Sequence, residues 1–307
     1  MGSWEWSDIL TQFGQQWSRV LGIGLLVLLY KLGLFTAKPS KLHIQCDSPS
    51  CVRCRTYTSR SMKFLHNKWS NYIKDVPKSE RMKFHRITET TRHYEAQPAE
   101  EHTIFELQNL STQPCYDRKF FENDVKLLED NFTKIHTEFS KIFNFRESSN
   151  IRKVNSTPSG KWSAFYLINQ GQEIKDNIQF CPDTYDVLKQ LQKLMTGCIF
   201  GNACFSVIEP GTIISEHYGP CNIRVRCHLG IEVPQGCELF VNHQKVQWQE
   251  SKCILFDDSY LHSVIYRKTS CTDQPRAVFM VDLWHPDLTF DEIKGLRFLL
   301  DPSKSIK

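Results

Sequence analysis

The sequence predicts a mainly β domain, an antiparallel sandwich or jelly-roll barrel with flanking helices, preceded by a transmembrane helix. Three observations lead to this fold class. Short apolar runs, rich in β-branched and aromatic residues, follow one another at roughly ten-residue spacing through 203–286 with no helical segment between them. Helical periodicity is confined to the segments before and after this region. An uncharged run, VLGIGLLVLLY, occupies residues 20–30.

The composition narrows the class of protein. Of the 307 residues, 40% are hydrophobic and 23% are charged, which is close to an average soluble protein and excludes both wholesale disorder and a polytopic membrane protein. The net charge of +4 is too small to indicate a nucleic-acid partner. The 12 cysteines are too few for a disulfide scaffold, although they are many for a cytosolic protein.

Residues 17–36 are predicted to be an uncleaved signal anchor that follows a short tail, 1–16. As a helix, residues 17–35 would span about 28 Å, roughly the hydrocarbon thickness of a bilayer. A cleaved signal peptide usually begins with a basic region, whereas residues 1–18 carry Glu5 and Asp8 and no Lys or Arg. A cleaved signal and a buried helix of the globular domain are the alternatives.

Two patterns disagree about the side of the membrane on which the domain lies. Basic residues follow the apolar segment, and by the positive-inside rule they would place the carboxyl-terminal part in the cytosol. Three sequons, at Asn109, Asn131 and Asn155, would be glycosylated only in a lumenal domain.

Residues 37–118 are predicted to be a linker and a basic juxtamembrane stem. Cys46, Cys51 and Cys54 form C-x4-C-x2-C, for which acylation or a local disulfide is favoured over zinc because no fourth ligand has matching spacing. Residues 53–93 are basic with interleaved aromatics. They are predicted to be a solvated, partly helical or mobile stretch, with attraction to anionic headgroups as the alternative.

Residues 119–300 are predicted to form the folded domain, with its core at 160–290. Helical periodicity covers 119–145 and 183–194, and a capping box at 289–292 opens a last helix that runs through Phe298. The predicted strands are 162–168, 203–208, 223–233, 237–241, 252–256, 262–266 and 277–284.

Two histidines in the β region stand at strand edges beside turns, His217 before Gly219 and His262 after 257–259. Such positions can converge at one mouth of a jelly roll, where neutral imidazoles bind a divalent metal. A non-haem Fe(II) oxygenase usually has His-x-Asp/Glu, but Gly219 offers no carboxylate. Either water and a bidentate 2-oxo acid complete a two-histidine site, or no catalytic metal binds and His262 is a core residue. A zinc hydrolase would need a third protein ligand.

Cationic groups on the neighbouring strands predict a bound acid. Arg276, on the strand after His262, can clamp a carboxylate bidentately. Arg224, Arg226 and His228 alternate along one strand and so share a face, where their charge is costly unless an anion is bound. Pairing of the two arginines with acids such as Glu232 is the alternative.

Five sequence blocks carry a family resemblance. They are FSVIEPGT at 205–212, HYGP at 217–220, NIRVRCHLG at 222–230, FDDSYLH at 256–262 and VDLWHP at 281–286. In this order they resemble the aspartyl/asparaginyl β-hydroxylase family over roughly 160–290, and most closely its membrane-anchored aspartate β-hydroxylase domain-containing members. The resemblance implies a 2-oxoglutarate- and Fe(II)-dependent dioxygenase on a double-stranded β-helix, a cupin-like jelly roll. Glycine at position 219 is a trait of this family.

The resemblance also implies roles for individual residues. His217 and His262 would bind Fe(II). Arg276 and Ser206 would hold the far carboxylate of 2-oxoglutarate. The remaining matches are Trp162, Arg226, Cys227 and His228 at cosubstrate positions and Arg224 near the acid group of the substrate.

The implied reaction uses O2 to hydroxylate an unactivated C–H bond while 2-oxoglutarate becomes succinate and CO2, with peptidyl Asp or Asn in a protein or peptide as one candidate substrate. No helical repeat like that of the founding hydroxylase is visible in residues 1–150. Members with an anchor of this kind are type II proteins with a lumenal domain, and we expect that topology here. A catalytically inactive lumenal scaffold that retains the fold is the alternative.

Overall fold

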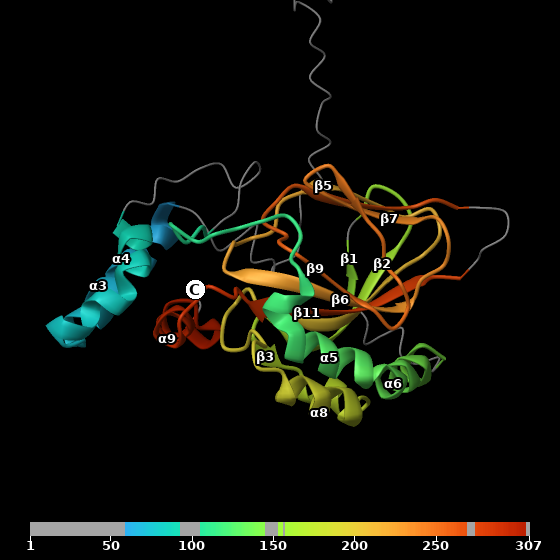
Figure 1. Ribbon diagram of the computed structural model, residues 1–307, viewed down its shortest axis with the longest axis horizontal. Coiled ribbons are helices and arrows are strands. Elements are labelled where there is room, and N and C mark those ends of the chain that lie inside the picture. Colours follow the sequence, from blue (N-terminus) through green and yellow to red (C-terminus); the bar gives the residue numbers. More distant parts are fainter. Residues whose placement is uncertain (1–58, 93–104, 145–152, 156, 269–273, 305–307) are drawn as a thin grey trace, which may run out of the picture. The chain divides into compact units, whose positions relative to one another are not determined.

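The computed structural model describes residues 59–92, 105–144, 153–155, 157–268 and 274–304. The chain divides into two compact units between Gln45 and Cys46, and all the described residues belong to the second unit. The mainly β prediction is confirmed, because the described strands form a seven-stranded and a four-stranded antiparallel sheet with helices beside them (Figure 1).

The larger sheet has the strand order β1-β2-β4-β11-β6-β9, and β3 pairs with β2 at its side. Every residue of the central strand β11 is buried, so this strand is covered on both faces. The strands are β1 (Lys153–Asn155), β2 (Trp162–Asn169), β3 (Gln172–Glu173), β4 (Ala203–Ile208), β6 (Arg224–Glu232), β9 (Cys253–Phe256) and β11 (Arg276–Trp284).

The smaller sheet has the order β5-β10-β7-β8 and faces the larger one, since side chains from both sheets form a common apolar cluster. Successive strands from β4 onward change sheets, with only β7 and β8 staying together. Residues distant in sequence therefore meet between the sheets. The strands are β5 (Ile213–His217), β7 (Cys237–Val241), β8 (Gln244–Val246) and β10 (His262–Tyr266).

Helices cover the outer face of the larger sheet (Figure 1). The ring centroid of Phe139 lies 5.3 Å from that of Phe205 on β4, which lies 4.8 Å from that of Phe279 on β11. Alternation along each strand sends one set of side chains into this core and the other set between the sheets. The elements are η2 (Arg118–Phe121), α5 (Glu122–Asp130), α6 (Phe132–Asn144), α7 (Lys175–Ile178) and α8 (Pro182–Gln190).

A separate apolar cluster joins the helices at residues 59–92 to the last long helix. Trp69 is buried there, and a Cβ added at Gly295 would lie 3.0 Å from both Trp69 and Ile87, so a larger residue would press these side chains apart. The capping box of Thr289 and Glu292 is confirmed. The elements are α3 (Ser59–Asp75), η1 (Lys78–Phe84), α4 (His85–Arg92), α9 (Phe290–Leu299) and η4 (Pro302–Lys304).

The structure differs from the sequence prediction in several places, and the short elements β1, β3, β8 and α7 are among those that the sequence does not predict. Residues 59–92, expected to be solvated, bury an apolar face against α9. The sequence does not predict β5, because most of its side chains are exposed and its pairing with β10 is interrupted by a bulge. A third prediction, the helix at 119–145, is confirmed in type but is divided into η2, α5 and α6.

Within the described ranges, no helix has the length and apolar character needed to cross a membrane. The predicted tail 1–16, the predicted anchor 17–36 and Cys46, Cys51 and Cys54 lie outside the described residues. The predicted domain bounds stay predictions.

Trp69→Ala tests whether the 59–92 helices fold as one unit with the sheets. The substitution removes a fully buried indole, so we expect the free energy of unfolding to fall by about 3–5 kcal/mol in a single transition. Phe64→Ala on the same helix, where the side chain is 41% exposed, should cost less than about 1 kcal/mol. A separate early transition in urea unfolding would contradict one-unit folding, and equal effects of both variants would contradict the burial of Trp69.

Candidate active site

The two histidines that the sequence singles out meet at the edge of the smaller sheet. His217 ends β5 and His262 begins β10, and the two are directly paired in the strand register. Their ring centroids are 4.0 Å apart. His262 is buried and His217 is half-buried, so the pair lies at the boundary between the interior and solvent, with His262 on the inner side. The predicted convergence is confirmed.

Backbone carbonyls fix the proton position on both rings. His217 Nδ1 lies 2.8 Å from the carbonyl oxygen of Ser215, and His262 Nδ1 lies 2.9 Å from that of Tyr260. A carbonyl can only accept, so each Nδ1 donates and each neutral ring carries its lone pair on Nε2. Burial, followed by the neighbouring His217, holds the pKa of His262 well below its usual value. Two imidazole rings that each present an Nε2 lone pair are suited to bind a divalent transition metal.

The carboxylate of Asp258 occupies the space beside Gly219. A Cβ added at Gly219 would lie 2.4 Å from the carboxyl carbon of Asp258 and 2.6 Å from each of its oxygens. The usual Asp or Glu ligand at position 219 would therefore collide with Asp258. Among the described residues, no group of three or more His, Cys, Asp or Glu is placed to hold a metal ion.

Asp258 belongs to a closed ionic cluster with Asp282, Arg224 and Arg226. Arg224 donates to Asp258 from Nε (3.1 Å) and Nη2 (2.5 Å), and to Asp282 from Nη1 (3.1 Å). Arg226 donates to Asp282 from Nε (2.9 Å) and pairs through Nη1 with Asp258 (3.0 Å). Burial alone would raise the pKa of Asp258, but the two guanidinium groups hold that pKa well below its usual value.

The cluster decides between two readings of the arginines. Arg224 and Arg226 share the inner face of β6 and pair with acids, as the alternative interpretation expected, but the acids are Asp258 and Asp282 in place of Glu232. Every nitrogen of the Arg224 guanidinium already donates to a protein acceptor, the carbonyl of Phe200 included, so this group is not left facing an acidic substrate.

Arg276 has the opposite environment. It is buried, and among the described residues no carboxylate lies within ion-pair distance of it. Its Nη1 donates a long hydrogen bond (3.4 Å) to the Ser206 carbonyl, while its Nε is buried with no partner. Burial lowers the pKa of Arg276 to about 10. A buried cation without an anion is costly, which fits a site that receives an acid.

Ser206, Trp162 and His228 lie on the same inner face as Arg276. Trp162 and Arg276 both pair with Ile208, one from each side of β4, and Trp162 Nε1 donates to Ser206 Oγ at 3.0 Å. His228 Nδ1 accepts from Trp248 Nε1 at 3.2 Å, so the proton of the neutral ring is on Nε2, which is buried without a partner. Burial, then Arg226, Arg276 and His262, hold the pKa of His228 well below its usual value.

Cys227 does not join this set. Cys227 lies between Arg226 and His228 on β6, and its side chain points to the opposite face of the sheet. There it packs in the core under the helices, where its thiol contacts Cys253. Alternation along the strand is the reason.

The three predicted glycosylation sites have different surroundings. Asn109 is exposed, whereas the amide nitrogen of Asn131 donates to the Leu127 carbonyl and that of Asn155 is buried. Because a glycan is attached to the amide nitrogen, Asn109 is the most accessible of the three acceptors in the folded structure and Asn155 is blocked.

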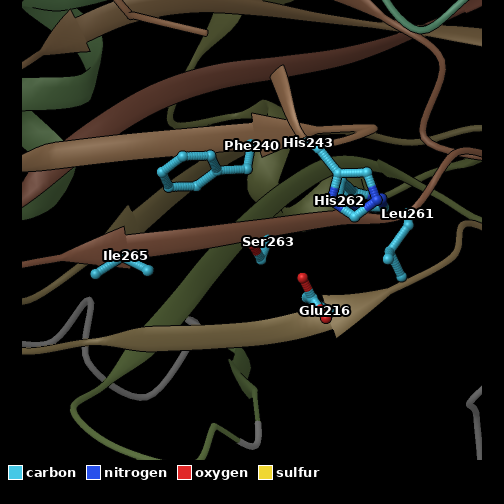
Figure 2. A pocket seen from close by; sticks show the side chains of 7 residues that line it. All are labelled: Glu216, Phe240, His243, Leu261, His262, Ser263 and Ile265. Carbon is cyan, nitrogen blue, oxygen red and sulfur yellow. The ribbon is translucent and has the colours of Figure 1, made fainter. Parts of the chain in front are cut away.

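A cavity of about 290 Å³ lies on the outer side of the smaller sheet (Figure 2). Leu239, Val241 and Val264 point between the sheets, so their strand neighbours Phe240 and Ser263 point outward into this cavity. It therefore opens on the side of the sheet away from Arg276, although His262 of the histidine pair is among its lining residues. Its lining residues are Glu216, Phe240, His243, Leu261, His262, Ser263 and Ile265.

The chain belongs to the aspartyl/asparaginyl β-hydroxylase family, whose model matches residues 129–286. It is 42% identical over 267 residues to human "Aspartate beta-hydroxylase domain-containing protein 2", covering 85% of this chain and 72% of the relative. It is 38% identical over 198 residues to mouse "Aspartate beta-hydroxylase domain-containing protein 1", covering 64% and 55%. These comparisons confirm the resemblance seen in the sequence blocks.

Human "Aspartyl/asparaginyl beta-hydroxylase" is 32% identical over 203 residues, covering 63% of this chain and 26% of the relative. Among solved structures, an oxidoreductase of the 2OG-Fe(II) oxygenase family from Burkholderia pseudomallei superposes with a TM-score of 0.35 at 9% identity, covering 46% of this chain and 75% of that one.

Asp282→Asn tests the ionic cluster. The variant leaves two buried guanidinium groups with one carboxylate, so we expect the free energy of unfolding in urea to fall by about 3–5 kcal/mol. The matched control is Glu238→Gln, which breaks solvent-screened surface ion pairs with Lys245 and Arg267 and should leave the free energy of unfolding nearly unchanged. Equal losses in the two variants would contradict the role given to Asp282.

Asp257→Asn tests a second buried carboxyl group, beside the cluster. Asp257 is fully buried, its Oδ2 has no partner, and burial raises its pKa to about 7 from the ordinary 3.8. The unfolded chain releases this proton near pH 4 and the folded chain only near pH 7, so Asp257 makes the protein less stable as pH rises through that window.

We therefore expect Asp257→Asn to be more stable than the parent protein at pH 8, by on the order of 3 kcal/mol, with the difference shrinking toward pH 4. Urea unfolding across this pH range measures it, with the exposed Asp186→Asn as control. A stability difference that does not change with pH would show that Asp257 ionises normally.

Proposed function

We propose that this chain is a hydroxylase that uses Fe(II), 2-oxoglutarate and O2 to oxidise an unactivated C–H bond. The proposal rests on the charged side chains of the inner face of the larger sheet. At one end of this face they are neutralised by other protein groups, and at the other end they are not. Arg224 and Arg226 are balanced by aspartates, whereas Arg276 Nε and His228 Nε2 have no acceptor in the described residues. The ring centroid of Phe256 lies 5.0 Å from that of His228 and 6.0 Å from that of His262, so this end adjoins the histidine pair.

The proposed fold is a double-stranded β-helix. From β4 to β11, successive strands belong alternately to the two sheets, except that β7 and β8 lie in the same sheet. This alternation is typical of a jelly roll. In such a barrel the ends of strands from both sheets surround one mouth. His217 and His262 stand at strand ends and would lie at that mouth.

His217 and His262 would hold Fe(II) through Nε2, since both Nδ1 atoms donate to backbone carbonyls. Bound Fe(II) with 2-oxoglutarate and O2 supplies the oxidation that converts C–H to C–OH as 2-oxoglutarate becomes succinate and CO2. The chain has the task of binding and orienting the diacid and excluding water. No protein general base is required.

Arg276 and Ser206 would hold the far carboxylate of 2-oxoglutarate. Ser206 Oγ accepts from Trp162 Nε1, which leaves the hydroxyl proton to be donated to a ligand. His228 would donate from Nε2 to another oxygen of the diacid. Arg226 would act indirectly, because its guanidinium is occupied in holding Asp258 and Asp282.

The proposed substrate class is a protein or peptide, with Asp or Asn as the candidate residue. The support is that three relatives carry names that refer to aspartate or to aspartyl/asparaginyl hydroxylation. Residues 17–36 lead us to propose a single-pass type II membrane protein with this domain in the lumen of the secretory pathway. The second candidate, favoured by the saturation of Arg224, is a lumenal binding protein that retains the fold without turnover.

Thermal shift and succinate production test the proposal together. We expect 2-oxoglutarate to raise the melting temperature with Mn(II) present, by the equivalent of about 2.7 kcal/mol at a concentration 100 times its dissociation constant. His217→Ala and His262→Ala should lose this metal dependence and at least about 100-fold of succinate production with Fe(II). His243→Ala removes an exposed histidine beside the outer cavity and should change neither.

Binding of 2-oxoglutarate and metal without succinate from any candidate peptide would favour the scaffold alternative. Absence of both binding and turnover would overturn the proposed function.

A further inference from the structure

We propose that Trp248 is the positioning residue of the cosubstrate site, because one indole sets the proton of His228 and the plane of Arg276. The proposal rests on the proposed function and adds a specificity-determining residue to it. Trp248 lies between β8 and β9, is 5% exposed and packs in the apolar cluster between the two sheets. It is absent from the sequence blocks that carry the family resemblance.

The first contact sets the tautomer of His228. An indole N–H can only donate, so the 3.2 Å hydrogen bond from Trp248 Nε1 requires His228 Nδ1 to be the acceptor. The proton of the neutral ring is thereby assigned to Nε2. His217 and His262 have the opposite tautomer, because their Nδ1 atoms face carbonyls. The site thus contains two rings that present lone pairs and one that presents a proton.

The second contact sets the plane of Arg276. Its guanidinium carbon lies 4.7 Å from the centroid of the Trp248 ring, within the range of a cation–π interaction. An aromatic face stabilises the buried cation without using any of its N–H groups. The N–H donors that lie in the guanidinium plane therefore stay available to a carboxylate, and Nε has no partner in the described residues.

Together the two contacts orient the two unpartnered buried donors of the site. A core that served only stability would not keep both Arg276 Nε and His228 Nε2 without acceptors. Without the indole N–H, His228 can move its proton to Nδ1 and present a lone pair at Nε2, which repels a carboxylate. Without the ring, the guanidinium plane is no longer fixed.

Trp248→Phe and Trp248→Leu separate these two contributions. Phe keeps an aromatic ring near Arg276 but has no N–H, and Leu removes both. With Mn(II) present, calorimetry on the full chain should show 2-oxoglutarate bound about tenfold more weakly by Trp248→Phe, since one hydrogen bond to a charged group is affected, and more weakly still by Trp248→Leu. The affinity for Mn(II) alone should be unchanged.

The matched control is Trp69→Phe. Trp69 is also a buried tryptophan whose Nε1 donates a hydrogen bond, to Thr88 Oγ1 at 3.0 Å, but it lies in the cluster formed with α9. The readout that a merely structural role would not change is the tautomer of His228. Nitrogen NMR of histidine-labelled protein should show Nε2–H in the parent protein and an increased Nδ1–H population in Trp248→Phe.

Each outcome is decisive. Weaker 2-oxoglutarate binding with a tautomer change in Trp248→Phe, and neither in Trp69→Phe, supports the proposal. Unchanged binding in Trp248→Phe, an unchanged tautomer, or equal losses in the two Phe variants overturns it. Failure of the parent protein to bind 2-oxoglutarate at all overturns the proposed function itself, and with it this inference.

Discussion

The buried ionic cluster of Asp258 and Asp282 with Arg224 and Arg226 is the constraint on which the geometry of the site depends. Its arginines come from β6 of the larger sheet, one aspartate from β11, and the other from the turn that leads into His262. Asp258 also packs against Gly219, two residues after His217. The cluster therefore ties the strands that carry both histidines to the larger sheet. Removal of one member of such a buried cluster strongly destabilises the protein. The cluster can therefore hold these strands in fixed positions.

The two ends of the inner face of the larger sheet differ in whether their charged side chains are neutralised by other protein groups. Where Arg224 and Arg226 lie, every charge is balanced within the protein. Where Arg276 and His228 lie, two buried donors have no acceptor in the described residues, and burial opposes the charge of Arg276. The free energy that such groups cost is recovered when an acid binds. If the proposed function is right, the diacid binds at the second end, because Arg276 is the one of these three arginines that has no carboxylate partner among the described residues.

The sequence predicts the parts of this arrangement that follow from local patterns. Alternation along β6 places Arg224, Arg226 and His228 on one face, and turn signals beside His217 and His262 predict their convergence; both are confirmed. It does not predict which acids neutralise the arginines, because that depends on the register of β6 against β11. The one acid in the apolar run FMVDLW, Asp282, was the available signal. Trp248 could not be found this way, since it lies in an irregular segment, and the roles of the site residues stay predictions.

The most direct test of the account is a crystal structure of the chain with Mn(II) and 2-oxoglutarate. We expect a single metal ion about 2.1 Å from Nε2 of both His217 and His262, with one carboxylate of the diacid against Arg276 and Ser206. A metal bound elsewhere, or a diacid bound to Arg224 in place of its aspartate partners, would contradict it.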